Sequence, residues 1–129
     1  MKRIAVIGAG NWGTALAATL AKTGHTAALW AHEPEVVESI RTRHENALFM
    51  PGVKLPQSIA VTNDLGEALE GAEVVLTAMP SHVCYPLYER MLNHLRPEMI
   101  FVSATKGIDA DRLMRMSELI QSVDRKSVV

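Results

Sequence analysis

The sequence predicts a doubly wound α/β fold, in which helices cover both faces of a parallel sheet. Short apolar runs alternate with segments of helical periodicity, and these runs are apolar throughout, as expected for strands buried on both faces. A glycine-rich turn joins the first run to the first helical segment. With 129 residues and 48% hydrophobic content, the chain is long enough for one domain with its own core, and we expect residues 1–129 to form it.

The first half of the chain predicts three strands and three helices. The expected elements are a strand at 4–7, a helix at 14–22, a strand at 27–31, a helix at 35–43 and a strand at 59–62. Pro34 is well placed to open the second helix, and Asn63 or Asp64 can cap a third helix that runs to Leu69. Residues 43–58 show no periodicity and predict a surface loop of unusual length, which suggests a role.

The second half continues the alternation of strands and helices. The expected elements are a strand at 73–78, a helix at 83–95, a strand at 99–104, a helix at 111–123 and the opening of a sixth strand at 127–129. Because this fold needs further strands, we expect the chain to be truncated before the last of them.

Charge and cysteine content exclude several classes of protein. The 13 Lys and Arg residues against 14 Asp and Glu residues give a net charge of −1, so no basic surplus favours nucleic acid as a partner. The single cysteine, Cys84, forms neither an internal disulfide nor a thiolate metal site, so we expect no metal and a reducing cytoplasm. Glycines and Asn11 interrupt the apolar N-terminal run, so we expect a strand there and no membrane span.

The strongest chemical signal is a G-x-G-x-x-G motif formed by Gly8, Gly10 and Gly13 between the first strand and the first helix. In a Rossmann-type domain the first glycine permits the tight turn, the second lets a diphosphate approach the backbone, and the third allows the helix to pack on the strand. The alternative is that these glycines only shape a tight turn. Their place inside a βαβ unit favours a dinucleotide, NAD or NADP, bound at the helix N-terminus.

His32 and Glu33 follow the second strand, where the adenosine ribose of a bound dinucleotide lies. Glu33 is near the spacing of the acid that binds the ribose hydroxyls, which would favour NAD. Protonated His32 could instead attract the extra phosphate of NADP. Glu33 could equally be the first-turn acid of the next helix, so the preference between NAD and NADP stays open.

Ligands in this fold gather beyond the C-terminal ends of the strands, which directs attention to the residues after the fourth and fifth strands. Pro80 and Val83 follow the fourth strand and are expected at the cofactor, whereas Lys106 and Gly107 follow the fifth. Lys106 suits a substrate phosphate or a polarised carbonyl, although a solvated surface lysine is the plain alternative. Trp12 is either a packing residue or a wall of the dinucleotide site.

Four segments together resemble one family of enzymes. They are residues 8–17 at the glycine turn, Leu29-Trp30-Ala31-His32, the long loop with His44-Glu45-Asn46 and Phe49-Met50-Pro51-Gly52-Val53-Lys54-Leu55-Pro56, and Ala104-Thr105-Lys106-Gly107-Ile108-Asp109. The chain resembles the N-terminal, cofactor-binding part of NAD(P)-dependent sn-glycerol-3-phosphate dehydrogenase over nearly its whole length. The loop combined with Trp12 and the Lys-Gly pair is much more specific than the glycine turn alone.

This resemblance implies reversible hydride transfer between NAD(P)H and dihydroxyacetone phosphate, giving sn-glycerol 3-phosphate for glycerophospholipid synthesis. It implies that Asn11 and Trp12 contact the dinucleotide, that His32 lies at its adenosine end, and that Lys106 meets the nicotinamide and the substrate. It also implies a catalytic proton-acceptor lysine in a helical domain beyond Val129, and it admits a homodimer.

The chain departs from the family at Phe49, where tyrosine is frequent, and we expect the family's helical domain to be absent from residues 1–129. Two other functions remain as alternatives. One is another reductase of the hydroxyacid or ketopantoate type, which shares the turn and lacks this loop. The other is a non-catalytic dinucleotide sensor, which a longer native reading frame would argue against.

Overall fold

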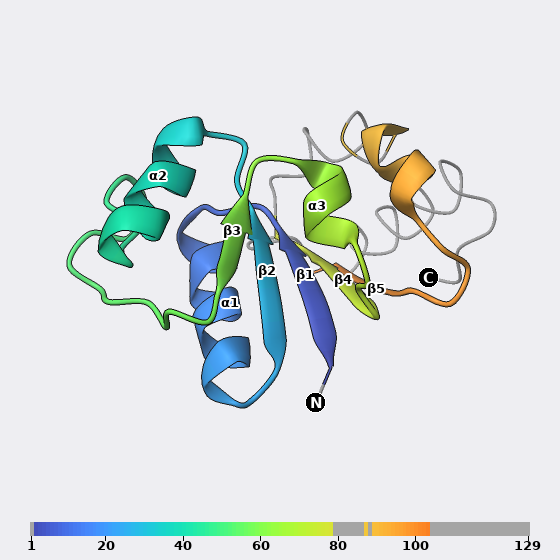
Figure 1. Ribbon diagram of the computed structural model, residues 1–129, viewed down its shortest axis with the longest axis horizontal. Helices are drawn as coiled ribbons and strands as arrows, with labels where there is room; N and C mark the ends of the chain where they lie inside the picture. Colours follow the sequence, from blue (N-terminus) through green and yellow to red (C-terminus); the bar gives the residue numbers. More distant parts are fainter. Residues whose placement is uncertain (1, 79–86, 88, 104–129) are drawn as a thin grey trace, which may run out of the picture.

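Five parallel strands form one sheet in the order β3-β2-β1-β4-β5 (Figure 1). The computed structural model describes residues 2–78, 87 and 89–103. The strands are β1 (Arg3–Ile7), β2 (Thr26–Trp30), β3 (Ala60–Thr62), β4 (Val74–Thr77) and β5 (Ile100–Ser103). The helices are α1 (Asn11–Lys22), α2 (Pro34–Arg43), α3 (Leu65–Leu69) and the short 3₁₀ helix η1 (Leu92–His94). This parallel sheet with connecting helices confirms the predicted fold class.

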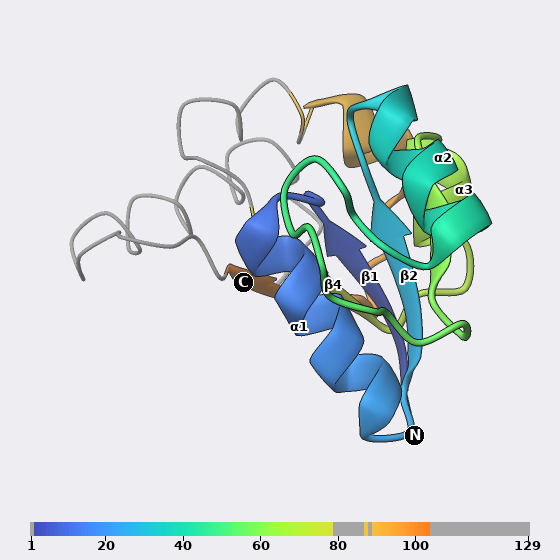
Figure 2. The same cartoon turned by 90° about the vertical axis from the view of Figure 1, so that its left-hand side faces the viewer.

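Helices cover both faces of the sheet, as its uniformly apolar strands predict. Along β1, Ile4 and Val6 belong to one buried cluster while Ala5 and Ile7 belong to another, because successive side chains of a strand point to opposite faces. Helix α1 contributes to the first cluster and α3 to the second, and Figure 2 shows these helices on opposite sides of the sheet. The two clusters are therefore the two halves of the core.

Several predicted boundaries need correction. Helix α1 begins at Asn11 instead of Thr14, since Gly10 is its N-cap and accepts the first helical hydrogen bond from Thr14 at 3.0 Å. The predicted strand at 59–62 begins at Ala60, and the helix predicted to reach Leu95 gives way to η1 after Met91. A proline at position 97 disfavours helical backbone in the residue before it, which agrees with this early end. The elements predicted at 111–123 and 127–129 lie outside the described residues.

Helix α3 begins at a side-chain cap. Asp64 is the N-cap, and its carboxylate accepts a hydrogen bond from the backbone N–H of Glu67 at 3.1 Å. Of the two predicted capping residues, Asp64 is therefore the one that caps this helix.

The long segment between α2 and β3 is not the simple surface loop that its composition predicts. Asn46 is completely buried and Leu55 is only 4% exposed, so the segment contributes to the interior. Ser39 of α2 holds it, because the Ser39 hydroxyl donates to the carbonyl of Glu45 and accepts from the N–H of Ala47. The sequence did not reveal this burial, because the polar side chain of Asn46 forms hydrogen bonds to Ala9 and Thr14, which lie far away along the chain.

Arg41 of α2 reaches across to the outermost strand at this end of the sheet. Its Nε and Nη2 atoms donate to the carbonyl oxygen of Val61 at 3.2 and 2.9 Å. The guanidinium also lies 3.9 Å from the carboxylate of Glu67 in α3. Helix α2 is thereby tied to β3 through polar contacts as well as through the core.

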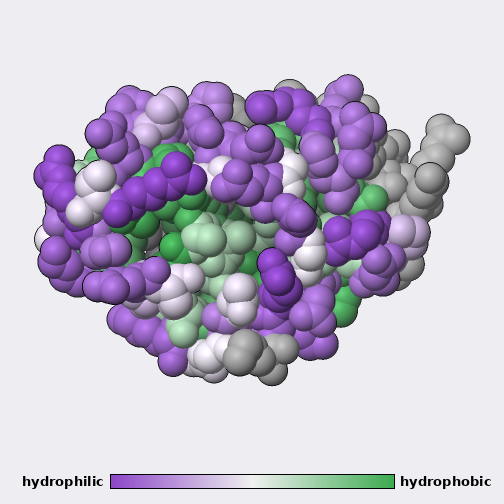
Figure 3. Space-filling view, in the orientation of Figure 1, coloured by the Kyte–Doolittle hydropathy of each residue, from purple (hydrophilic) through white to green (hydrophobic). Residues whose placement is uncertain are grey.

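Hydrophilic residues surround the rim of the face shown in Figure 3, and apolar residues gather in a hollow near its middle. Within the described residues, no helix combines the length and apolar character that crossing a membrane requires.

Candidate functional site

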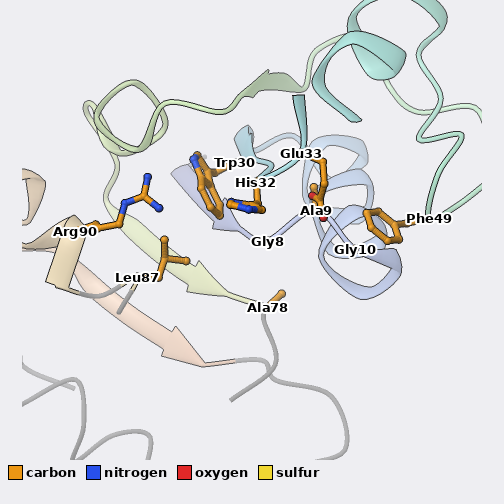
Figure 4. Close-up of a pocket in the computed structure, with 10 residues that line it drawn as sticks. All are labelled: Gly8, Ala9, Gly10, Trp30, His32, Glu33, Phe49, Ala78, Leu87 and Arg90. Atoms are coloured by element: carbon orange, nitrogen blue, oxygen red, sulfur yellow. The ribbon is translucent and has the colours of Figure 1, made fainter. Parts of the chain in front are cut away.

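A cavity of about 430 Å³ lies at the carboxyl ends of β1, β2 and β4 (Figure 4). Its lining residues come from the glycine turn, the end of β2, the long loop and the segments that follow β4: Gly8, Ala9, Gly10, Trp30, His32, Glu33, Phe49, Ala78, Leu87 and Arg90. The strand order reverses between β1 and β4, and open α/β sheets bind ligands at this reversal. The cavity is therefore the candidate site.

Backbone hydrogen bonds extend the sheet into the floor of this cavity. The N–H of Gly8 donates to the carbonyl of Trp30 at 3.0 Å, and the N–H of Ala78 donates to the carbonyl of Ile7 at 2.9 Å. These bonds hold the residues that follow β1 and β4 in fixed positions beside the end of β2. The site is consequently built on the rigid part of the fold.

Backbone conformation at Gly8 and close packing at Gly13 require glycine at these two positions. Gly8 has a φ of 117°, a conformation that residues with a Cβ rarely adopt. A Cβ on Gly13 would lie 1.8 Å from the carbonyl oxygen of Gly8 and 3.3 Å from the Cβ of Ala78. The predicted close packing of the first helix on the strand is thus confirmed at Gly13.

Gly10 differs from these two glycines. Its φ is −72°, which any residue adopts, and a Cβ built on it would meet no atom within 4 Å. No contact inside the described protein therefore explains a glycine at this position. The open space beside its backbone is the space that a bound diphosphate needs.

The N-terminus of α1 is suited to an anion. Gly10 offers no side-chain cap, and the first turn of α1 contains no acidic residue. The N–H groups in the first turn of a helix have no acceptor within the helix, and the helix dipole favours negative charge there. A dinucleotide diphosphate therefore fits this end of the cavity.

His32 and Glu33 lie where the ribose of a dinucleotide is expected. His32 is exposed and its ring centroid lies 6.1 Å from that of Trp30, at an angle of 51°. Glu33 is half-buried and is the N-cap of α2, where its backbone carbonyl accepts from Val36. Its carboxylate makes no capping hydrogen bond. Glu33 can therefore serve both at the start of the helix and at the ribose, since its backbone starts α2 while the residue lines the cavity.

Phe49 and Arg90 are lining residues that the sequence did not assign to the site. Phe49 lies beside Gly10, and Arg90 lies on the side of Trp30 and Leu87 (Figure 4). Arg90 is exposed and makes no ion pair within the described part of the chain. The sequence marked both residues only weakly. Phe49 was notable only as a departure from a family motif. Arg90 could have been placed at the site only through its spacing of three residues from Leu87, which puts both on the same face of a helix.

The remaining predicted residues fall into two groups. Asn11 and Trp12 form the first turn of α1 and are exposed, with Trp12 at 44%, and neither lines the cavity. Trp12 is thus outside the buried core, and its role at the cofactor stays a prediction. Pro80, Val83, Lys106 and Gly107 lie outside the described residues.

Comparisons with known proteins agree with this geometry. The family model described as "NAD-dependent glycerol-3-phosphate dehydrogenase N-terminus" matches residues 3–129. The chain is 52% identical over 124 residues to a glycerol-3-phosphate dehydrogenase [NAD(P)+] of Koribacter versatilis, covering 95% of this chain and 37% of that protein. It therefore spans little more than a third of the length of that relative.

Solved structures give the same result. The crystal structure of glycerol-3-phosphate dehydrogenase from Coxiella burnetii superposes with a TM-score of 0.82 at 30% identity, covering 94% of this chain and 37% of that one. The enzyme from Saccharomyces cerevisiae gives a TM-score of 0.83 at 24% identity, covering 97% and 39%, which shows the shared fold. Since the family model matches almost the whole chain, this chain belongs to the family of NAD-dependent glycerol-3-phosphate dehydrogenase N-terminal domains.

Proposed function

We propose that this chain binds NAD or NADP in the cavity at the carboxyl ends of β1, β2 and β4. The observation that carries the proposal is the difference between the three glycines of the turn. The protein itself requires Gly8 and Gly13, whereas Gly10 borders open space and has an ordinary backbone conformation. A ligand that approaches the backbone at Gly10 accounts for that glycine.

Each wall of the cavity has a role in this proposal. The N–H groups at the start of α1 bind the diphosphate, and the carboxylate of Glu33 accepts hydrogen bonds from ribose hydroxyls. Trp30 and Phe49 supply apolar surface for the rings. The indole N–H of Trp30 is buried and has no hydrogen-bond acceptor among the described residues. When bound, the nicotinamide supplies the hydride chemistry, and this chain orients it.

For the whole protein we propose reversible hydride transfer between NAD(P)H and dihydroxyacetone phosphate, giving sn-glycerol 3-phosphate for glycerophospholipid synthesis. The family model and the names of the relatives support this reaction over that of a ketopantoate-type reductase or a sensor. In this proposal residues 1–129 are the cofactor domain, Lys106 and Gly107 meet the substrate, and a lysine beyond Val129 accepts the proton. A cytoplasmic location and a homodimer complete it.

Gly10→Ala tests the proposed binding site. A Cβ at this position should leave the fold intact, because it meets no atom of the described residues and φ is −72°. The same Cβ would intrude on a diphosphate, so we expect the Kd for NADH and NADPH to rise more than about tenfold, roughly 1.4 kcal/mol. Calorimetric titration measures the Kd, and thermal unfolding verifies that the variant is folded.

Two results would contradict the proposal. Parent protein that binds neither NADH nor NADPH would exclude a dinucleotide site. Unchanged affinity in folded Gly10→Ala would mean that the diphosphate lies elsewhere and that the turn is only structural.

A further inference from the structure

The side chain of Asn46 forms hydrogen bonds to residues of the candidate site, a role that no motif in the sequence suggested. It lies in the segment between α2 and β3 and is completely buried. Its Nδ2 atom donates to the carbonyl oxygen of Ala9 at 2.8 Å and to the hydroxyl of Thr14 at 2.9 Å. Its Oδ1 atom accepts from the backbone N–H of Phe49 at 3.1 Å. One side chain thus joins the glycine turn, the first helix and the long loop.

The hydrogen bond to Ala9 fixes the orientation of a peptide group in the glycine turn. The Ala9 carbonyl also accepts from the Thr14 hydroxyl, at 3.2 Å, so two buried donors hold it. The N–H of Gly10 belongs to the same planar trans peptide and therefore points in the opposite direction, away from Asn46. This N–H donates no hydrogen bond to another described residue. It is thereby left available to a ligand beside Gly10.

The hydrogen bond to Phe49 fixes a second wall of the same cavity. Phe49 is half-buried, packs against the core cluster that contains α1, and lines the cavity beside Gly10. Because its backbone N–H is held by Asn46, the position of its ring is coupled to the position of the turn. The carbonyl of Asn46 accepts from Met50 at 2.8 Å, which keeps this stretch of loop in a compact turn.

We propose that Asn46 is a positioning residue that holds the Gly10 amide and the Phe49 ring in the arrangement that binds the dinucleotide. The inference rests on the proposed function, because it assumes that the cavity holds NAD or NADP. Preorganised donors bind more tightly because the cost of ordering them is met during folding. Asn46 itself touches no part of the cofactor in this proposal.

Ser39 provides a matched control for this role. It is also a buried polar side chain that holds the same loop, through Glu45 and Ala47, and it forms no hydrogen bond with Ala9 or Phe49. If Asn46 only anchors the loop, Asn46→Ala and Ser39→Ala should have similar effects on both stability and binding.

The experiment measures the melting temperature and the Kd for NADH of the full-length protein and its variants. We expect both Asn46→Ala and Ser39→Ala to lower the melting temperature. Only Asn46→Ala should raise the Kd, by about tenfold, while Ser39→Ala stays within about twofold of the parent. Equal Kd changes in the two variants, or no change in either, would overturn the positioning role.

A double-mutant cycle with Phe49 provides a readout that a purely structural anchor would not move. If Asn46 acts partly through Phe49, the loss of affinity in the double variant Asn46→Ala/Phe49→Ala should be smaller than the product of the two single losses. If the loss of affinity in the double variant equals the product of the two single losses, the two residues act separately, and this part of the inference is overturned.

Asn46→Asp separates the two functions of the side chain. It keeps an oxygen for the Phe49 N–H and loses the donors to Ala9, so we expect its Kd to lie above that of the parent and below that of Asn46→Ala. If neither variant folds, Thr14→Val removes the other donor to Ala9 with little change in shape, and a weaker Kd is again expected. Unchanged affinity in Thr14→Val would then overturn the proposal. Parent protein that fails to bind either nucleotide would instead overturn the proposed function together with this inference, whereas intact parent binding confines a negative result to Asn46.

Discussion

At the scale of single residues, the glycine turn has no room for a side chain at Gly13, whose Cα faces the carbonyl of Gly8. A Cβ at Gly13 would lie 1.8 Å from the Gly8 oxygen, so no side chain fits there unless the turn moves. The partner atom belongs to the backbone, so it cannot rotate away as a flexible side chain would. The end of β1 and the start of α1 therefore depend on this glycine.

Gly13→Ala should lower the free energy of unfolding by about 3 kcal/mol or more, the upper range for overpacking a rigid site. Urea denaturation measures this loss, with Gly10→Ala as the control because its added methyl meets no atom in the described part of the chain. A Gly13→Ala protein within about 1 kcal/mol of the parent would mean that the turn relaxes around the methyl group.

Arg90 belongs to the residue scale as well, because it sets a charge at one end of the cavity. Discrimination for NADP in this fold depends on a cation beside the extra phosphate, and Arg90 lines the cavity without an ion pair among the described residues. We expect Arg90→Gln to weaken NADPH binding about tenfold while NADH binding changes less than about twofold.

The matched control is Arg96→Gln. Arg96 lies near in sequence but is already engaged, donating to Glu98 at 2.9 Å and to the carbonyl of Ala72 at 2.6 Å. Arg96→Gln should leave the ratio of the Kd for NADPH to the Kd for NADH unchanged. Equal losses for both nucleotides in Arg90→Gln would show that Arg90 contacts a part that they share and that it does not select between them.

At the scale of elements, strand positions were predictable because the apolar residues of β1, β2 and β4 are buried or half-buried. Periodicity located β1, β2 and β4, and Asp64 marked the start of α3. The start of α1 was missed because Gly10 and Asn11 have poor helix propensity, although a backbone N-cap needs none. Local patterns therefore give the elements but not their first turns.

The site was predictable only where a motif and a strand end coincide. Gly8, Gly10, His32 and Glu33 line the cavity because they follow β1 and β2 directly. The role of Asn46 depends on a hydrogen bond to Ala9, 37 residues earlier in the chain, and no local pattern encodes such a contact. The same holds for Phe49, whose place beside Gly10 follows from the path of the long loop.

At the scale of the whole molecule, this chain covers only part of the length of its relatives, and we assign cofactor binding and proton transfer to different parts of the full protein. Residues 1–129 match about a third of the Koribacter versatilis protein, and in our proposal this third orients the cofactor. We expect a protein of these 129 residues alone to bind NAD(P)H weakly and to reduce no dihydroxyacetone phosphate. Calorimetry and a spectrophotometric reductase assay test the two parts, and sustained turnover would refute the assignment of proton transfer to residues beyond Val129.

The contact between Arg41 and Val61 has a consequence for how copies of this protein behave toward one another. Strand β3 lies at the end of the sheet, and an uncovered strand at that position is a template for intermolecular β-pairing and aggregation. Since the Thr62 carbonyl faces β2, where it accepts from Ala31, the preceding carbonyl of Val61 faces outward. The guanidinium of Arg41 occupies that carbonyl, and β3 is only three residues long. A neighbouring chain thus finds little free backbone with which to extend the sheet at β3, so the hydrogen bonds of Arg41 disfavour β-pairing between copies at this edge.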